Sequence, residues 1–218
     1  MPDASISGAS GHSFALNLLT SLRPAQWTKN LLVFAGLLFG RRLFEPVAGG
    51  RAAAAFAIFC LLSGVVYLIN DVADRESDRR HPLKARRPVA SGALPIPVAI
   101  GWAIALGGLG LACAFALGGR FFAVAVAYLA LLALYSGPLK HVVIIDVLTI
   151  AIGFVLRAVA GAVVVNVDIS HWLLLCTILL ALFISLAKRR HELVRLPGTD
   201  IYRTRFESAW GGAGTLRA

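Results

Sequence analysis

Long apolar runs dominate the chain, and short clusters of charged residues separate them. A helix needs about 20 mostly apolar residues to cross the hydrocarbon core of a bilayer. The candidate spans are 30–40, 52–70, 88–119, 121–139, 142–165 and 169–187. The first is short and spans only if it includes Trp27 and if Arg41 and Arg42 reach toward the interface. The pattern predicts an all-α, polytopic transmembrane bundle of about six helices.

The composition supports a membrane protein, because 58% of the residues are hydrophobic and only 15% are charged. A soluble domain has roughly 45–50% apolar and about 25% charged residues. The 21 Lys and Arg against 11 Asp and Glu would indicate nucleic acid in a soluble protein. In a membrane protein they indicate cytoplasmic loops and anionic partners, so we expect membrane lipids and no nucleic acid. Three widely spaced cysteines in apolar runs argue against a disulfide framework or a zinc site.

The distribution of basic residues predicts the orientation. With six spans and an inside N-terminus, sixteen of the 21 Lys and Arg fall on the inside and four on the outside. We therefore expect a multi-pass protein of the inner (cytoplasmic) membrane with its N-terminus and charged loops in the cytoplasm. We divide the chain into an N-terminal arm (1–22), a transmembrane domain (23–195) and a polar tail (196–218). The oligomeric state is not predicted.

The densest polar cluster follows the second apolar run and begins at Asn70. On one helix, Asp71, Asp74 and Asp78 would share a face, with Asn70 at its border. Three stacked carboxylates repel one another, and a divalent cation relieves that repulsion. Oxygen ligands suit Mg²⁺, so we predict Mg²⁺ as the cofactor, held by these four residues. A solvated helix end is the alternative interpretation.

A basic segment, 79–88, directly follows the aspartates and contains His81, Lys84 and Arg87. Basic groups beside a carboxylate–Mg²⁺ site are what a departing diphosphate requires. The positive-inside rule explains the sign of this segment but not its position next to Asp78.

Charged residues also mark two later span boundaries, at Lys140 and at Lys188, Arg189 and Glu192. Each of these clusters also has a plain interpretation as an anchor at the membrane boundary. Arg157 lies inside the fifth run, where a charge is costly, so it needs a partner or an anionic ligand.

Together these clusters resemble the UbiA superfamily of intramembrane prenyltransferases. Asn70-Asp71-x-x-Asp74-x-x-x-Asp78 matches its first aspartate-rich motif. Tyr135-x-x-x-x-Lys140 resembles its Tyr/Lys element, with one residue more than the usual spacing.

Three segments narrow the resemblance to the decaprenyl-phosphate phosphoribosyltransferase branch. They are 23–30, which contains Lys29, then 81–92, and 146–147 together with 153–157. Most of the superfamily has a second DxxxD motif after the sixth span. This chain has Lys188-Arg189-x-x-Glu192-Leu193 there, as that branch does.

The resemblance implies Mg²⁺-dependent transfer of 5-phosphoribose from phosphoribosyl diphosphate to a polyprenyl phosphate at the cytoplasmic face. It implies catalytic roles for Asp71, Asp74, Asp78 and Lys140. Substrate binding is implied for Asn70, Lys29, His81, Lys84, Arg87, Tyr135, Arg157, Lys188, Arg189 and Glu192.

Superfamily members usually have nine spans, so we expect a chain truncated after the sixth. Three other functions stay open: an aromatic prenyltransferase of the same superfamily, an inactive fragment, and a membrane carrier.

Overall fold

The computed structural model describes residues 6–136 and 143–195, with side chains at 14–135, 145 and 147–187. All regular elements in these ranges are helices, which confirms the all-α prediction. They are α1 (Ile6–Ser21), η1 (Pro24–Phe34), α2 (Ala35–Phe39), α3 (Pro46–Ala73), α4 (Arg75–Arg80), η2 (Lys84–Arg86), α5 (Pro88–Ser91), α6 (Ile96–Leu117), α7 (Gly119–Ser136), α8 (Val143–Val164) and α9 (His171–Arg195).

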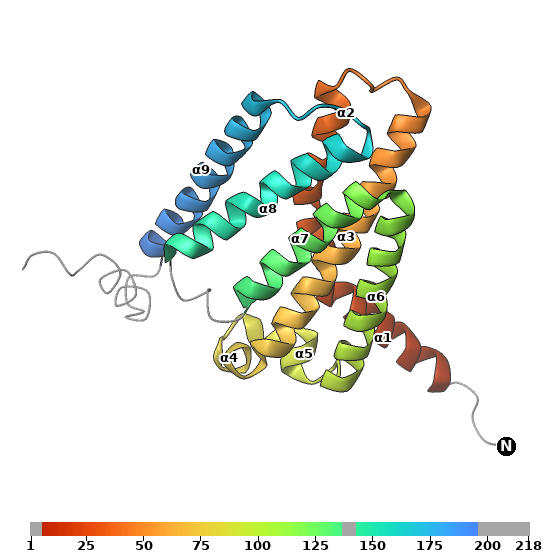
Figure 1. Ribbon diagram of the computed structural model, residues 1–218. Helices are drawn as coiled ribbons and strands as arrows, with labels where there is room; N and C mark the ends of the chain where they lie inside the picture. The colour runs from red at the N-terminus through yellow and green to blue at the C-terminus, as the bar shows by residue number, and fades with distance from the viewer. Residues whose placement is uncertain (1–5, 137–142, 196–218) are drawn as a thin grey trace, which may run out of the picture.

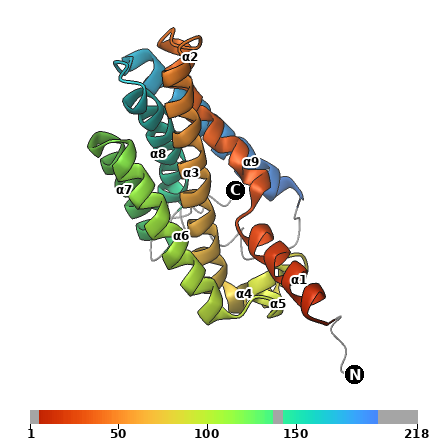
Figure 2. The same ribbon diagram turned by 90° about the vertical axis from the view of Figure 1, so that its right-hand side faces the viewer.

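The five long helices form an up-and-down bundle around α3 (Figures 1 and 2). Helix α3 packs against α6, α7, α8 and η1. Their shared core is apolar and contains Phe59 and Leu62 of α3, Phe121 and Tyr128 of α7, and Val164 of α8. The α4–α5 segment, the end of α7 and the end of α9 all lie toward the lower part of Figure 1, opposite α2.

Within the described ranges, three helices are long and apolar enough to cross a membrane: Pro46–Ala73, Ile96–Leu117 and Val147–Val164. The apolar parts of the next two, Gly119–Tyr135 and His171–Ala187, are shorter. Many large apolar side chains on the outside of the bundle are exposed, as lipid-facing positions require. The chain is an integral membrane protein.

The first predicted span is α-helical only in part, which corrects that prediction. The segment begins with η1, a 3₁₀ helix of 11 residues, and continues as α2, an α-helix of 5 residues. Because a 3₁₀ helix rises ~2.0 Å per residue against ~1.5 Å for an α-helix, the two together reach about 30 Å. That length equals the thickness of the hydrocarbon core, although the segment is short.

A crossing of small residues brings this first segment against α8. A Cβ built on Gly161 would lie 1.8 Å from the carbonyl oxygen of Val33, and one on Gly36 would lie 2.5 Å from the Ala162 nitrogen. No side chain fits at either position, so the two backbones touch directly.

Arginines at the opposite end from α4 and α5 close helix C-termini. Arg51 donates from Nε to the Val164 carbonyl (2.8 Å) and from Nη2 to the Leu117 carbonyl (3.0 Å). Arg42 donates to the Val165 carbonyl at 3.1 Å. Cations at such positions satisfy terminal carbonyls and the helix dipole. This explains basic residues on the side that the sequence assigns to the outside.

Candidate functional site

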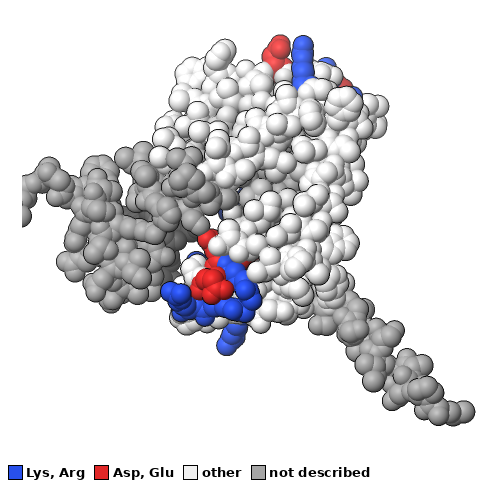
Figure 3. All heavy atoms as spheres, turned by 60° about the horizontal axis from the view of Figure 1, so that its bottom comes forward, with Lys and Arg blue, Asp and Glu red and all other residues white. Residues whose placement is uncertain are grey.

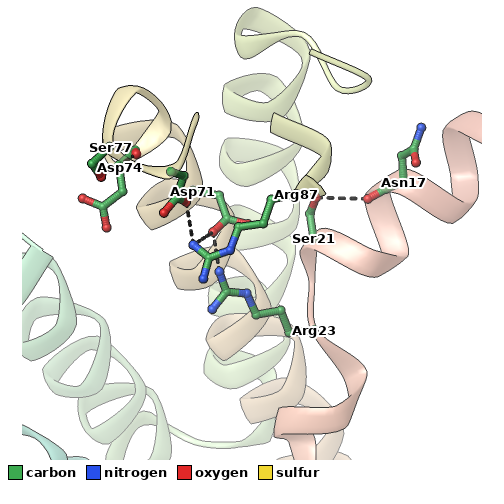
Figure 4. Close-up of polar contacts among 8 residues, drawn as sticks. Asn17, Ser21, Arg23, Asp71, Asp74, Ser77 and Arg87 are labelled. Carbon is green, nitrogen blue, oxygen red and sulfur yellow. Dashed lines mark hydrogen bonds and ion pairs between the residues drawn. The ribbon is translucent and has the colours of Figure 1, made fainter. Parts of the chain in front are cut away.

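The acidic cluster lies where α3 ends. Helix α3 stops at Ala73, Asp74 forms a turn with φ −92° and ψ 6°, and α4 begins at Arg75. The prediction of three carboxylates stacked on one face of a single helix is therefore wrong. Asp71 and Asp78 are buried and converge, whereas Asp74 is half-buried and lies apart from Asp71 in Figure 4.

Two arginines neutralise the two buried aspartates. Arg87 lies between them, with its Nη1 3.2 Å from Oδ1 of Asp71 and 2.6 Å from Oδ2 of Asp78. Arg23 donates from Nη2 to the same Oδ1 of Asp71. Figure 4 shows both guanidinium groups pointing at Asp71 from different elements. The approach of these cations explains why Asp71 and Asp78 turn inward together.

Local backbone features place the two arginines. Arg23 links α1 to η1 in the left-handed conformation, with φ 53° and ψ 64°, which is uncommon for a residue with a side chain. Its guanidinium lies 4.9 Å from the centre of the Tyr67 ring. Arg87 precedes α5, and Arg79 joins α4 to α5 by donating to the Ala90 carbonyl at 2.9 Å. The loop that follows α4 therefore folds back over the aspartates.

The donor set fits a magnesium ion only in part. Within the described part of the chain, no three His, Cys, Asp or Glu side chains come together as metal ligands. The carboxylates of Asp71 and Asp78, however, converge on one cationic nitrogen of Arg87. Mg²⁺ in proteins is usually held by one or two carboxylates, waters and substrate phosphates. The pair fits a metal that arrives with a phosphate-bearing ligand.

The other predicted residues of this end fall into two groups. Asn70, His81, Lys84 and Tyr135 are half-buried, the first three close in sequence to the paired aspartates and the last near the end of α7. Charged side chains gather over this end of the molecule in Figure 3. Lys140 lies outside the described residues. The backbone of α9 includes 188–192, but the side chains of Lys188, Arg189 and Glu192 are outside the described part.

Lys29 lines a different cavity, of about 210 Å³, between η1, α8 and α9. Thr28 and Thr177 supply hydroxyl groups to its wall, and Phe154 and Leu180 contribute apolar surface.

Arg157 lies at a second polar centre, inside the bundle. It is 7% exposed and donates three hydrogen bonds. Their acceptors are Oδ1 of Asn30 (2.7 Å), the Gly153 carbonyl (2.8 Å) and the hydroxyl of Tyr128 (2.7 Å). Asn30 in turn donates to Ser63 Oγ at 3.1 Å. No carboxylate among the described side chains forms an ion pair with this arginine.

Sequence reasoning missed four residues of these centres as individuals: Arg23, Asn30, Tyr128 and Ser63. The sequence could have indicated Arg23, because this cation stands just before an apolar run, at the membrane face that is predicted to hold the aspartates. Asn30, Tyr128 and Ser63 give only a weak signal, because polar residues of this kind are common inside membrane helices.

Comparisons with known proteins agree with this fold. The sequence profile of the UbiA prenyltransferase family matches residues 30–192. A decaprenyl-phosphate phosphoribosyltransferase from Corynebacterium glutamicum is 38% identical over 191 residues, covering 84% of this chain and 56% of that protein. One from Mycobacterium tuberculosis is 37% identical over 180 residues, covering 81% and 60%. The chain thus spans a little over half the length of these relatives.

A solved structure has a similar arrangement of helices. The UbiA homolog from Archaeoglobus fulgidus bound to DMAPP and Mg²⁺ superposes with a TM-score of 0.70. It is 22% identical in sequence, and the match covers 89% of this chain and 73% of that one. At 22% identity, the similarity to this structure shows the fold alone.

Proposed function

Because the chain belongs to the UbiA prenyltransferase family, we propose that it transfers 5-phosphoribose from phosphoribosyl diphosphate to a polyprenyl phosphate of decaprenyl type. Diphosphate leaves, and the reaction depends on Mg²⁺. The α4–α5 end faces the cytoplasm in the inner membrane. There it meets a water-soluble donor, while the lipid acceptor approaches from the bilayer.

One observation carries the proposal. The relatives that are 37–38% identical to more than four-fifths of this chain are named for decaprenyl-phosphate phosphoribosyl transfer. The family profile matches residues 30–192, which include both aspartates and Arg87.

The residues of this end suit the donor's diphosphate. Asp71 and Asp78, with Asp74 and Asn70 beside them, would hold Mg²⁺, which neutralises the leaving diphosphate when bound. Arg87, Lys84 and His81 lie on the segment that folds back over the aspartates, and basic groups there donate to phosphate oxygens. The bond from the anomeric carbon to the diphosphate breaks, and the electron pair leaves with the diphosphate.

The acceptor needs little activation. A polyprenyl phosphate oxygen is already an anion, and it forms the new bond to the anomeric carbon without a strong general base. Catalysis is then mainly positioning and charge stabilisation.

A second set of basic residues would hold the donor's 5-phosphate. We assign Lys140, Lys188 and Arg189 to it, and we assign Tyr135 and Glu192 to substrate binding as well. Lys29, an exposed residue that lines the cavity between η1, α8 and α9, completes the proposed set. We assign Arg157 to holding the helices together instead, because its three hydrogen bonds go to neutral partners within the bundle.

A donor-choice assay tests the proposal. Membranes that contain the chain receive labelled phosphoribosyl diphosphate, decaprenyl phosphate and Mg²⁺, and the label in extracted lipid is counted. We expect labelled lipid from the wild type, none from Asp74→Ala or Asp71→Ala, and wild-type levels from Glu76→Ala, an exposed carboxylate of the same end.

Two outcomes contradict the proposal. One is the absence of labelled lipid from correctly folded protein. The other is label that comes only from a prenyl diphosphate donor with an aromatic acceptor, which supports the aromatic prenyltransferase instead. Full activity in Asp74→Ala would show that Asp74 is not part of the metal site.

A further inference from the structure

Both buried aspartates of the α4–α5 end are already neutralised by the chain itself. Asp71 and Asp78 are each 2% exposed. The side chains of Arg23 and Arg87 are 28% and 27% exposed. Two negative and two positive charges thus form one group, and its positive members lie on the more open side.

We propose that Arg23 and Arg87 are specificity-determining residues, which make this acidic site select a metal–diphosphate pair over the free metal. The inference rests on the proposed function, because it assumes that a metal and a diphosphate bind at this end. It adds that neither binds well without the other.

Charge balance leads to this selectivity. The four side chains sum to zero, so a divalent cation entering alone must approach two guanidinium groups and compete with them for the same carboxylate oxygens. A neighbouring positive charge weakens the binding of a proton to a carboxylate by about tenfold or more. A divalent metal ion carries twice the charge of a proton, so the same arginines should weaken its binding to these oxygens at least as much. Diphosphate reverses the balance, since it supplies anionic oxygens both to the metal and to the displaced arginines.

The contacts allow such an exchange. Arg87 reaches both aspartates through a single nitrogen, Nη1, so its guanidinium has other N–H groups to donate to a phosphate. Arg23 touches Asp71 with Nη2 and lies over the Tyr67 ring. That ring remains a place for the guanidinium when the carboxylate binds a metal.

The test is equilibrium dialysis of Mn²⁺, used as a probe for Mg²⁺, against the full chain in nanodiscs. Dialysis counts the metal that the protein retains, with and without inorganic diphosphate on both sides. We expect diphosphate to tighten Mn²⁺ binding to the wild type about tenfold or more. In Arg23→Gln, Mn²⁺ alone should bind about tenfold more tightly than to the wild type, and diphosphate should add less.

Matched variants separate charge from other effects. Arg80→Gln removes one positive charge from an exposed residue of α4, and its Mn²⁺ affinity should stay at the wild-type value. Arg23→Lys keeps the charge and should also resemble the wild type. Arg87→Gln repeats the prediction through a second residue, in case Arg23→Gln does not fold.

The possible failures differ. If Mn²⁺ binds the wild type equally well with and without diphosphate, and neither glutamine variant binds it more tightly, the selectivity is wrong while the metal site stands. If no variant retains Mn²⁺ under any condition and Asp71→Asn changes nothing, both this inference and the proposed metal site are overturned.

Discussion

The two arginine centres of this protein accommodate their positive charges in different ways, one with carboxylates and the other with neutral acceptors. At the α4–α5 end, Arg23 and Arg87 pair with two carboxylates, and Arg87 lies 2.6 Å from Asp78. Inside the bundle, Arg157 makes three hydrogen bonds, all to uncharged acceptors. One centre is electrically neutral, and the other keeps a full positive charge among dipoles.

The two centres differ in whether a ligand can replace the partners of their arginines. A charge deep in a membrane protein is costly and is retained only where every donor is satisfied. Asn30, Tyr128 and the Gly153 carbonyl satisfy Arg157 and join η1, α7 and α8 at one point, so this centre fixes the fold. At the α4–α5 end the aspartates are buried but their arginine partners are partly exposed to water, so other ions can replace the arginines. The α4–α5 end is therefore suited to binding, and the interior centre to holding the helices together.

The largest effect is expected for Arg157→Met. The substitution leaves Asn30 and the Tyr128 hydroxyl without a donor in the bundle interior, which should cost about 3–5 kcal/mol of unfolding free energy. Reversible unfolding in mixed micelles measures it. The double variant Arg157→Met with Asn30→Leu should recover part of the loss, and an unchanged stability of the single variant would refute the role of this centre.

Gly161→Ala should cost about 3 kcal/mol, because its Cβ would collide with the backbone of η1. The collision pushes η1 away from α8 and thereby separates Asn30 from Arg157. The same unfolding measurement applies, with Gly101→Ala as the control, since a Cβ there meets nothing within 4 Å. Equal stabilities for the two variants would contradict the close crossing.

Arg87→Gln should destabilise the protein by about 1–2 kcal/mol, because Arg87 is partly exposed to water and the glutamine amide can still donate to the buried carboxylates. Its lipid-labelling activity, in contrast, should fall about 100-fold, since a charged donor to the leaving group is lost. Measuring both quantities on one preparation gives the comparison. A stability loss larger than that of Arg157→Met would reverse the roles assigned to the two centres.

Tyr128→Phe removes one acceptor of Arg157 and keeps the ring packed on Phe59, where the centroids are 5.1 Å apart. The loss of one hydrogen bond should cost about 1 kcal/mol. Thermal unfolding of the variant beside the wild type detects a change of this size. A gain in stability would mean that the hydroxyl does not support Arg157.

The apolar runs predicted most of the helices, because length and hydrophobicity alone decide which segments cross a bilayer. The run 52–70 became α3, and 169–187 became the apolar part of α9. The 3₁₀ form of η1 was not predicted, and no local pattern indicates its close contact with α8, where Gly161 meets Val33, 128 positions away in the chain.

The candidate site was predictable in its residue types but not in its pairing. The aspartates and the basic segment after them are adjacent in sequence. Arg23 reaches Asp71 from 48 residues away, and no local spacing indicates such a contact. Arg157 was expected to need a partner, yet its partners are neutral and come from other helices. Long-range hydrogen bonds of this kind become visible only in three dimensions.

A structure of the full chain with Mg²⁺ and phosphoribosyl diphosphate bound tests the contrast between the two centres most directly. We predict that Asp71 and Asp78 contact the metal, that Arg23 and Arg87 donate to the diphosphate, and that Arg157 keeps its bonds to Asn30 and Tyr128. A complex in which both arginines remain on the aspartates, or in which Arg157 leaves its neutral partners for the ligand, would contradict the account.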